Sequence, residues 1–314
     1  MKETRGAISL LVIGASLSLQ RTEALCADEP GDTPMPCCQN AQDAEPASRT
    51  ASDSQKVDVG RLVIVGGTAI AGMVSVQIYQ ANGWWKDNRT SFHFREDLDY
   101  SRGVDKLGHL YGASAFTFMV SKALRWSNLE QSDALLYGAA GSIFWQTFIE
   151  VQDGFSTWGF DRVDFAANLV GAFYPFLQYS VPTFRDFNLK FSYHPSDLLN
   201  TSGGIGFRGQ EHLIFDDYEG QTVWLNVNVN NLLPRGVEPY WPDWLAIALG
   251  YGARSVAGPD PHSVLLLSLD YDMTRIIPGN NAFLQTLGEA LNFIHFPAPA
   301  VRISPDAIWY GLYF

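Results

Sequence analysis

The chain has 314 residues, room for one large domain or two modest ones, and 46 % of them are hydrophobic whereas only 17 % are charged. Soluble domains usually hold about 25 % charged residues, so this composition favours contact with a membrane. The net charge of −12 would repel phosphate groups, which argues against a nucleic-acid partner and against electrostatic docking on anionic lipid.

The amino terminus is typical of an export signal. Lys2 and Arg5 flank an apolar run at 7–19 that is too short to span a bilayer as a mature helix. We therefore expect residues 1–27 to be a signal peptide. The protein is expected to be exported to the cell envelope, to face the periplasm and to associate with a membrane, with the outer membrane as one candidate.

Cys26 allows a second interpretation, a lipoprotein, although Leu25 is not the small residue expected before a lipid-accepting cysteine. All three cysteines precede the apolar segments, so none can cross-link the folded region. Residues 28–56 are rich in Asp, Glu, Pro, Ser, Ala and Gln, a composition that predicts a disordered tether.

A membrane-associated bundle of four apolar helices is predicted for residues 57–182. The first helix is uncharged and long enough either to cross a bilayer or to be a buried core helix. Small residues recur along the others, at Gly108 and Gly112, at Gly138 and Gly141, and at Gly171 after Ala167, and should let the helices approach closely. The expected helices are 62–79, 105–126, 132–152 and 162–179.

Residues 183–314 are predicted to be rich in β-structure packed on the bundle. Runs with a period of two or with continuous apolar character are separated by Gly, Pro, Asn and Asp. We interpret them as an antiparallel sheet or a partial barrel, interrupted by a helix at 282–293, so the fold class is α+β. The expected strands are 188–193, 223–229, 245–251, 264–272 and 308–314.

Polar residues four positions apart occur at one end of three of these helices, a spacing that puts both members on one helix face. The first pair opens its helix, the second closes its helix and the third opens its helix. In an up-down-up arrangement these three ends meet, so the sequence predicts one polar cluster at one end of the bundle. The pairs are Asp105 with His109, Gln146 with Glu150, and Asp164 with Asn168.

The loop at 82–104 should lie near this cluster, because it joins the end of the first helix to the start of the second. It carries Trp84, Trp85, His93 and Phe94. Glu150 and one further acidic residue, Asp153, would close a helix, where the dipole favours cations. A compensating partner is therefore expected, and Lys106, Arg162 or a metal ion would serve.

The cluster supports three interpretations: a polar network that fixes the helices, a divalent metal site, or an acid–base pair without metal. No other cofactor is expected, and without a P-loop or a GxGxxG motif no nucleotide partner is expected. The catalytic candidates are Asp105, His109, Glu150 and Asp164. The metal-ligand candidates are these four and Asp153. The supporting polar residues are Lys106, Gln146 and Asn168.

Several motifs occur in order: Trp84-Trp-Lys-Asp, Ser91-Phe-His-Phe, Asp105-Lys-x-Gly-His, Ile149-Glu-x-x-Asp-Gly-Phe-Ser, Trp158-Gly-Phe-Asp-x-x-Asp and Ala167-Asn-x-x-Gly. Together they resemble the YfiM-like family of bacterial proteins, labelled predicted periplasmic lipoproteins. Later motifs, from Lys190-Phe-Ser-Tyr to Leu249-Gly-Tyr-Gly, extend the resemblance from about residue 78 to the carboxyl terminus. The resemblance implies an envelope location and brings no activity and no catalytic residues.

Two functions are compatible with these observations. The first is a non-enzymatic, membrane-associated structural or binding protein of the bacterial cell envelope, with membrane lipid or other envelope proteins as partners. The alternative is a metal-dependent or acid–base hydrolase that acts on a lipid or cell-wall precursor at the membrane face.

Overall fold

The structure is a computed structural model, and the amino-terminal segments of the chain lie outside the residues that it describes. The expected signal peptide (1–27), its Cys26 and all of the expected tether except Lys56 are among these. The described residues are 56–82, 85–96, 100–200, 214–256 and 258–314.

Four long helices form where the sequence predicts them. Each has a charge-free middle and polar ends, and the fourth has a strong start signal, because the Asp161 side chain accepts hydrogen bonds from the backbone N–H groups of Val163 (2.7 Å) and Asp164 (3.4 Å). It ends at Ser180, shortly before Pro182. The helices are α1 (Val59–Asn82), α2 (Val104–Trp126), α3 (Gln131–Gly154) and α4 (Arg162–Ser180).

Three of these helices, α2, α3 and α4, pack closely on one another, and two of the predicted small residues make this approach possible. A Cβ atom on Gly171 of α4 would lie 2.1 Å from the backbone oxygen of Leu110 in α2, and one on Gly138 of α3 would lie 2.8 Å from that of Thr117. The prediction fails for Gly108 and Gly141, because a Cβ there would meet nothing within 4 Å.

The first helix, α1, differs from the expected fourth member of a packed bundle. None of its residues is buried, so the interpretation of this segment as a buried core helix is wrong. It is held beside α2 near its own start, where Asp58 donates its backbone N–H to Ser127 (3.0 Å) and Arg61 donates to the backbone oxygen of Trp126 (3.0 Å). Among the described residues, α1 is the helix that is long and apolar enough to cross a membrane.

The second half forms a six-stranded antiparallel sheet whose strands follow chain order, so the predicted α+β class is confirmed. The fifth strand is absent from the prediction, because Pro297 and Pro299 indicate a break. A register shift between Ala298 and Ala300 accommodates Pro299 within this strand. The strands are β1 (Phe187–Tyr193), β2 (Gln221–Val227), β3 (Leu245–Arg254), β4 (His262–Tyr271), β5 (Ala298–Ser304) and β6 (Ile308–Tyr313).

Short helical segments connect these elements, and two of them lie between β4 and β5. The second of the two confirms the helix predicted at 282–293. They are α5 (Met273–Ile276) and α6 (Ala282–Leu291), with 3-10 turns at Tyr100–Gly103, Pro182–Asp186, Val229–Leu232 and Glu238–Tyr240.

The sheet curls around its own interior. The Tyr313 hydroxyl on β6 lies 3.2 Å from the Thr222 hydroxyl on β2, and its ring meets that of Trp224 edge-on. On the other side, Phe191 of β1 forms a parallel bridge with Ile294, in the segment that leads into β5. The inner face is therefore enclosed by the sheet itself.

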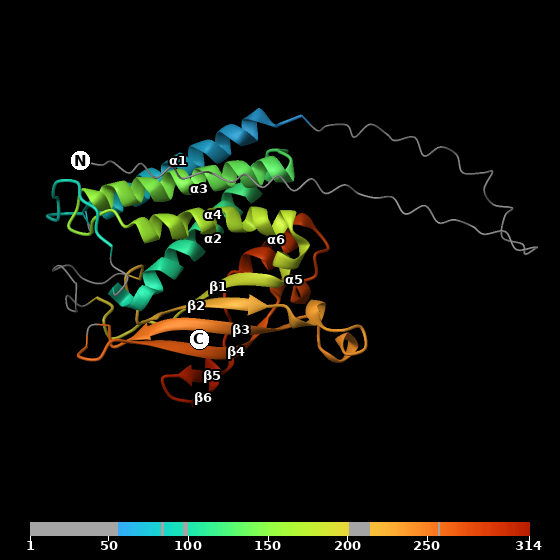
Figure 1. Cartoon of the computed structure of the whole chain (residues 1–314). Coiled ribbons are helices and arrows are strands. Elements are labelled where there is room, and N and C mark those ends of the chain that lie inside the picture. Colours follow the sequence, from blue (N-terminus) through green and yellow to red (C-terminus); the bar gives the residue numbers. More distant parts are fainter. Residues whose placement is uncertain (1–55, 83–84, 97–99, 201–213, 257) are drawn as a thin grey trace, which may run out of the picture. The chain divides into compact units, whose positions relative to one another are not determined.

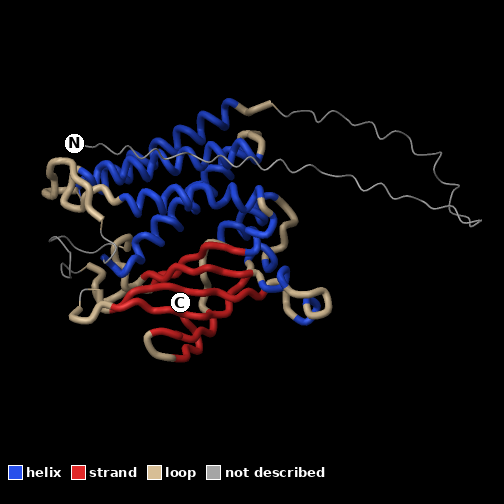
Figure 2. Tube along the Cα trace, in the orientation of Figure 1, coloured by secondary structure: helices blue, strands red, loops and turns tan. Residues whose placement is uncertain are grey.

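Helix α2 joins the helical half to the outer face of the sheet (Figures 1 and 2), where it contacts β1, β2 and β3. Tyr111 stacks on Phe191 with ring centroids 5.2 Å apart. At the start of α2, the Tyr251 hydroxyl donates to the backbone oxygen of Arg102 (2.6 Å). The start of α2 and the end of β3 therefore lie at the same end of the molecule.

Candidate functional site at the ends of three helices

The start of α2, the end of α3 and the start of α4 meet, as the sequence predicts. Asp105, Glu150 and Asp164 come from these three ends and line one cavity of about 70 Å³. Tyr218, from the connection between β1 and β2, also lines it, so the sheet half contributes to the site. The complete lining is Arg95, Asp105, Lys106, His109, Glu150, Asp153, Trp158, Gly159, Asp161, Asp164 and Tyr218.

Lys106 is the centre of one half of this cluster, which we call the closed half. Its Nζ lies 2.9 Å from Asp105, 2.8 Å from Asp161 and 3.0 Å from Asp164. Burial disfavours the ammonium charge, but the carboxylates of Asp105, Asp164 and Asp161 outweigh it and raise the pKa of Lys106. The lysine therefore supplies the compensating charge that the sequence requires.

Two further contacts complete the closed half. The Ser101 hydroxyl donates to Asp105 (3.1 Å), and the indole N–H of Trp85 donates to Asp153 (2.7 Å). Burial nevertheless raises the pKa of Asp153 to about 7. Trp85 thus lies at the cluster as predicted, whereas Trp84 lies outside the described residues.

His109, Glu150, Asp164 and Asn168 form the other half, which we call the open half. Asn168 orients its neighbours: its Oδ1 accepts from His109 Nδ1 (3.1 Å), and its Nδ2 donates to Glu150 (3.4 Å). Because an amide oxygen can only accept, His109 carries a proton on Nδ1, and its Nε2 faces the cavity. That Nε2 lies 3.9 Å from Asp164 Oδ2.

The two carboxyl groups of the open half are poorly compensated. Glu150 is only 2 % exposed, and burial, followed by repulsion from Asp164 and Asp153, raises its pKa to about 9. Burial also raises the pKa of Asp164. The second oxygen of Asp164, Oδ1, is buried and accepts no hydrogen bond from the described residues.

Three of the predicted site residues lie close enough together to bind one metal ion, and the others are held by different contacts. One ligand atom each from His109, Glu150 and Asp164 lie within 4.8 Å of one another, a group that could hold a metal ion. Asp105 and Asp153, predicted as further ligands, are instead held by Lys106 and Trp85. Gln146 lies beside Gly112, with its Nε2 3.8 Å from where a Cβ of that glycine would be, and is not in the cavity lining.

Asp161 is the site residue that the sequence analysis does not single out. Its carboxylate caps α4 with one oxygen and pairs with Lys106 through the other. The signal was available, since an Asp immediately before an apolar helix is a strong N-cap. Its pairing with Lys106, 55 positions earlier, could not be read from spacing.

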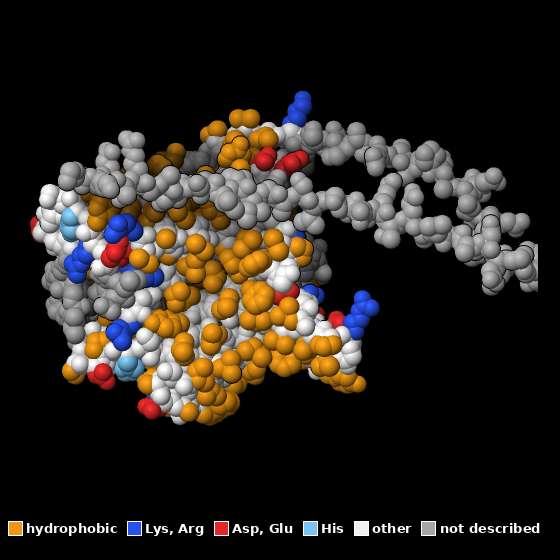
Figure 3. All heavy atoms as spheres, viewed as in Figure 1, with side chains coloured by type: hydrophobic (Ala, Val, Ile, Leu, Met, Phe, Trp, Pro, Cys, Tyr) orange, Lys and Arg blue, Asp and Glu red, His pale blue; other side chains and the backbone are white. Residues whose placement is uncertain are grey.

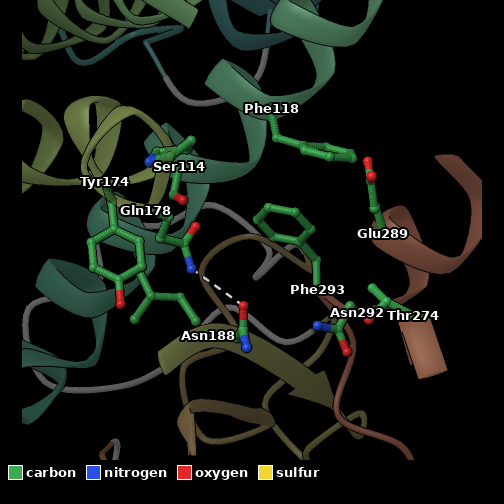
Figure 4. Close-up of a pocket in the computed structure, with 11 residues that line it drawn as sticks. Ser114, Phe118, Tyr174, Gln178, Asn188, Thr274, Glu289, Asn292 and Phe293 are labelled. Atoms are coloured by element: carbon green, nitrogen blue, oxygen red, sulfur yellow. Dashed lines mark hydrogen bonds between the residues drawn. The ribbon is translucent and has the colours of Figure 1, made fainter. Parts of the chain in front are cut away.

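A second cavity, of about 150 Å³, lies between α2, α4, β1 and α6 (Figure 4). Several of its polar side chains are already paired with one another or with the backbone. Gln178 donates to Asn188 (3.2 Å), the Tyr174 hydroxyl donates to Phe187 (2.9 Å) and Asn292 accepts from Met273 (3.1 Å). We therefore regard it as a gap in the packing between the two halves.

A second polar network lies inside the sheet and also escapes sequence analysis. Lys190 and Asp270 form an ion pair (3.1 Å), Asn226 donates to Asp270 (2.8 Å), and His295 Nδ1 lies 3.4 Å from the same carboxylate. The other nitrogen of His295 lies 3.5 Å from the Ser268 hydroxyl. These five side chains are 0–3 % exposed and no cavity described above reaches them, so the network serves the sheet interior.

Comparison with known proteins identifies the part of the chain that carries the site. Residues 93–180, which include α2, α3 and α4, match the family described as "Predicted periplasmic lipoprotein (DUF2279)". The match ends before the sheet, so it is shorter than the resemblance predicted from the sequence. No curated protein and no solved structure matches the chain.

This family description confirms the predicted location: the protein is exported and belongs to the cell envelope. It also confirms the resemblance predicted from the motifs between Asp105 and Gly171. The helical segment that builds the polar cluster, residues 93–180, is thus the part of the chain that is similar to the DUF2279 family of predicted periplasmic lipoproteins.

Proposed function

We propose that this protein is a non-enzymatic binding protein of the cell envelope that holds one divalent transition-metal ion in the open half of the cluster. The observation that carries the proposal is the convergence of His109, Glu150 and Asp164 beside a cavity, with one oxygen of Asp164 unpartnered. The ligands would be His109 Nε2 and one carboxylate oxygen from each acidic residue.

The donor set suits a particular class of ion. One imidazole nitrogen with two carboxylate oxygens is typical of Zn²⁺ and Mn²⁺ sites, whereas Ca²⁺ and Mg²⁺ prefer oxygen ligands alone. Metal-bound histidines usually donate their other ring N–H to an oxygen, and His109 already does so to Asn168. The imidazole is therefore oriented before any ion arrives.

Charge gives a second reason for an ion. Asp105, Glu150, Asp153, Asp161 and Asp164 all line the cavity, and they outnumber its lysine and arginine. Lys106 pairs with Asp105, Asp161 and Asp164, whereas the basic side chain beside Glu150 is His109, with 3.6 Å between its Nδ1 and the carboxylate. A divalent cation beside Glu150 and Asp164 would compensate the carboxylates that Lys106 leaves unbalanced.

The size of the cavity favours binding over catalysis. About 70 Å³ accommodates an ion with a few waters, whereas pockets for organic ligands usually measure about 300–1,000 Å³. A hydrolase remains the second candidate, because three protein ligands leave a position for water, as in catalytic zinc sites.

Metal content tests the proposal directly. Full-length protein purified in detergent without chelator would be analysed by elemental mass spectrometry and then, after chelation, titrated with Zn²⁺ or Mn²⁺ in a calorimeter. We expect one ion per chain in the wild type and loss of binding in His109→Ala. His262→Ala, which alters a histidine on β4 outside the cavity, should bind normally and controls for adventitious histidine sites.

Asp105→Asn separates the two halves. It removes a carboxylate that Lys106 holds, so it should lower the melting temperature while leaving one bound ion. Wild-type protein without stoichiometric metal, or equal binding by His109→Ala, would contradict the proposal and leave a purely structural network. Metal-dependent turnover of a lipid or cell-wall precursor by the wild type would favour the hydrolase.

A further inference from the structure

Charged residues avoid the middle of every long element. The helices contain charge-free segments of 12 to 21 residues, and β2 contains no charged residue. The exceptions within the middle of the sheet are Lys190 on β1, which points inward and is 0 % exposed, and Arg302 on β5, which pairs with Leu266 of β4. The charge-free helical segments are 62–82, 110–121, 134–149 and 165–184.

The helices expose large apolar side chains along these segments. On α3, Tyr137 and Phe144 are seven residues apart and more than half exposed, and on α4 Val170 and Phe173 share one face. Helix α1 exposes apolar side chains along its whole length. In water such surface would be expensive, at about 25 cal/mol for each Å².

The outer face of the sheet is apolar, whereas the outer face of a sheet in a water-soluble protein is usually polar. Leu225, Leu249 and Leu267 face each other across β2, β3 and β4 on the outer face, and each is 38–46 % exposed. The inner face carries the buried polar network of Lys190 and Asp270 beside a small apolar core of Trp224, Ala248, Val264 and Leu266. Apolar side chains outside with polar ones inside are typical of strands that face lipid.

Charged side chains collect at the two ends of these elements. Figure 3 shows the result on one face, with a broad hydrophobic band and charged groups to its left and right. One end carries the polar cluster, Arg254 and His262, and the other carries Arg61, Arg125 and Arg185. The hydrophobic band, which we call the belt, therefore crosses both the helical half and the sheet.

The height of the belt fits a bilayer. The segment 134–149 of α3 spans about 24 Å as a helix, and 62–82 of α1 about 32 Å. Strands of seven to ten residues span about 23–33 Å. The hydrocarbon core of a bilayer is about 30 Å thick, and lipid-facing bands of barrel proteins are about 25 Å tall.

We propose that lipid hydrocarbon covers the belt on both halves of the molecule, so that the part of the outer sheet face that α2 leaves uncovered lies in the bilayer together with α1 and the outer faces of α3 and α4. A protein partner would cover one patch bounded by polar residues on all sides. Among the described residues, the charged borders of the belt instead lie at its two ends, along the direction in which helices and strands run. This inference does not depend on the metal.

One consequence concerns the position of the polar cluster. The charge-free segments end at Asn82, begin after His109, end before Glu150 and begin after Asp164. The cluster therefore lies at one border of the belt, at the level of the lipid headgroups, where ionisable groups remain in contact with water.

Position-specific fluorescence tests the inference in the full chain. The three cysteines would be replaced by serine, and single cysteines introduced by Phe144→Cys on α3 and Leu267→Cys on β4 would be labelled with an environment-sensitive dye. Asp260→Cys, beside the charged start of β4, is the matched control. Labelled proteins that keep the wild-type melting temperature would be reconstituted into phosphatidylcholine–phosphatidylglycerol vesicles.

At positions 144 and 267 we expect nitroxide-labelled lipid to reduce the fluorescence and aqueous iodide to leave it unchanged. At position 260 we expect iodide to reduce the fluorescence and nitroxide-labelled lipid to leave it unchanged. Val170→Cys and Leu249→Cys provide second positions on each half if a first variant does not fold. Iodide quenching at 267 with lipid quenching at 144 would mean that only the helices contact lipid and would overturn the inference. Protection from both quenchers at 144 and 267 would also overturn it, because protein would then cover the belt.

Discussion

Replacing Glu150 with glutamine has an expected effect whose sign depends on metal. In metal-free protein, burial raises the pKa of Glu150 from 4.5 to about 9, so the folded state retains a proton that the unfolded state releases. The free energy of unfolding then falls as pH rises between these two values, by about 1.4 kcal/mol per pH unit. The contribution of Glu150 is fully present below pH 4.5 and is lost once the pH passes 9.

Glutamine resembles the protonated acid and has no such pH dependence. Between pH 4.5 and pH 7, about 2.5 pH units, the wild type loses about 3 kcal/mol of its free energy of unfolding. Glu150→Gln should therefore be more stable than the wild type by about 3 kcal/mol at pH 7 when a chelator is present. A bound divalent ion reverses the order. It needs the ionised carboxylate, and at 1,000 times its Kd it would stabilise the wild type alone by about 4.1 kcal/mol, more than the advantage of Glu150→Gln.

The assay is urea unfolding in detergent, followed by tryptophan fluorescence at pH 5, 7 and 9, with chelator or with Zn²⁺. Glu130→Gln makes the same chemical change at an exposed position just before α3 and should have little effect in either condition. The reasoning is refuted if Glu150→Gln is less stable than wild type in chelator at pH 7, because the carboxylate would then be ionised and well paired without metal.

Two further predictions concern the packing around the site. Gly171→Ala should lower the free energy of unfolding by about 3 kcal/mol, because the new Cβ would lie 2.1 Å from the Leu110 oxygen. The control, Gly108→Ala, meets no atom within 4 Å and should raise the free energy of unfolding by up to about 1 kcal/mol. Equal thermal unfolding of the two variants would contradict the close approach of α4 and α2. Trp85→Phe removes the hydrogen bond that favours ionised Asp153 and should cost about 1–3 kcal/mol, more at pH 8 than at pH 5; a loss independent of pH would assign the role of Trp85 to packing alone.

The comparison of sequence and structure is clearest for the helix ends. Polar pairs spaced by four at the start of α2, the end of α3 and the start of α4 predict the cluster, because chain direction alone brings alternate ends together. The division into a closed and an open half was not predictable. It depends on Asp161 turning its carboxylate to Lys106 and on Asn168 bridging His109 and Glu150, contacts between helices that no spacing along one helix encodes.

The sequence by itself determined the four long helices, five of the six strands and the α+β class, since apolar runs and turn residues are local signals. Only the tertiary structure decided that α1 packs no core, because a helix apolar on every side has no stripe that selects a neighbour. Likewise only the curl of the sheet brought Lys190, Asp270 and His295 together and turned the leucines outward. Side chains alternate between the two faces of a strand whichever face is buried. The period-two pattern in the sequence therefore does not say which face lies inside, and the packing of the whole sheet decides it.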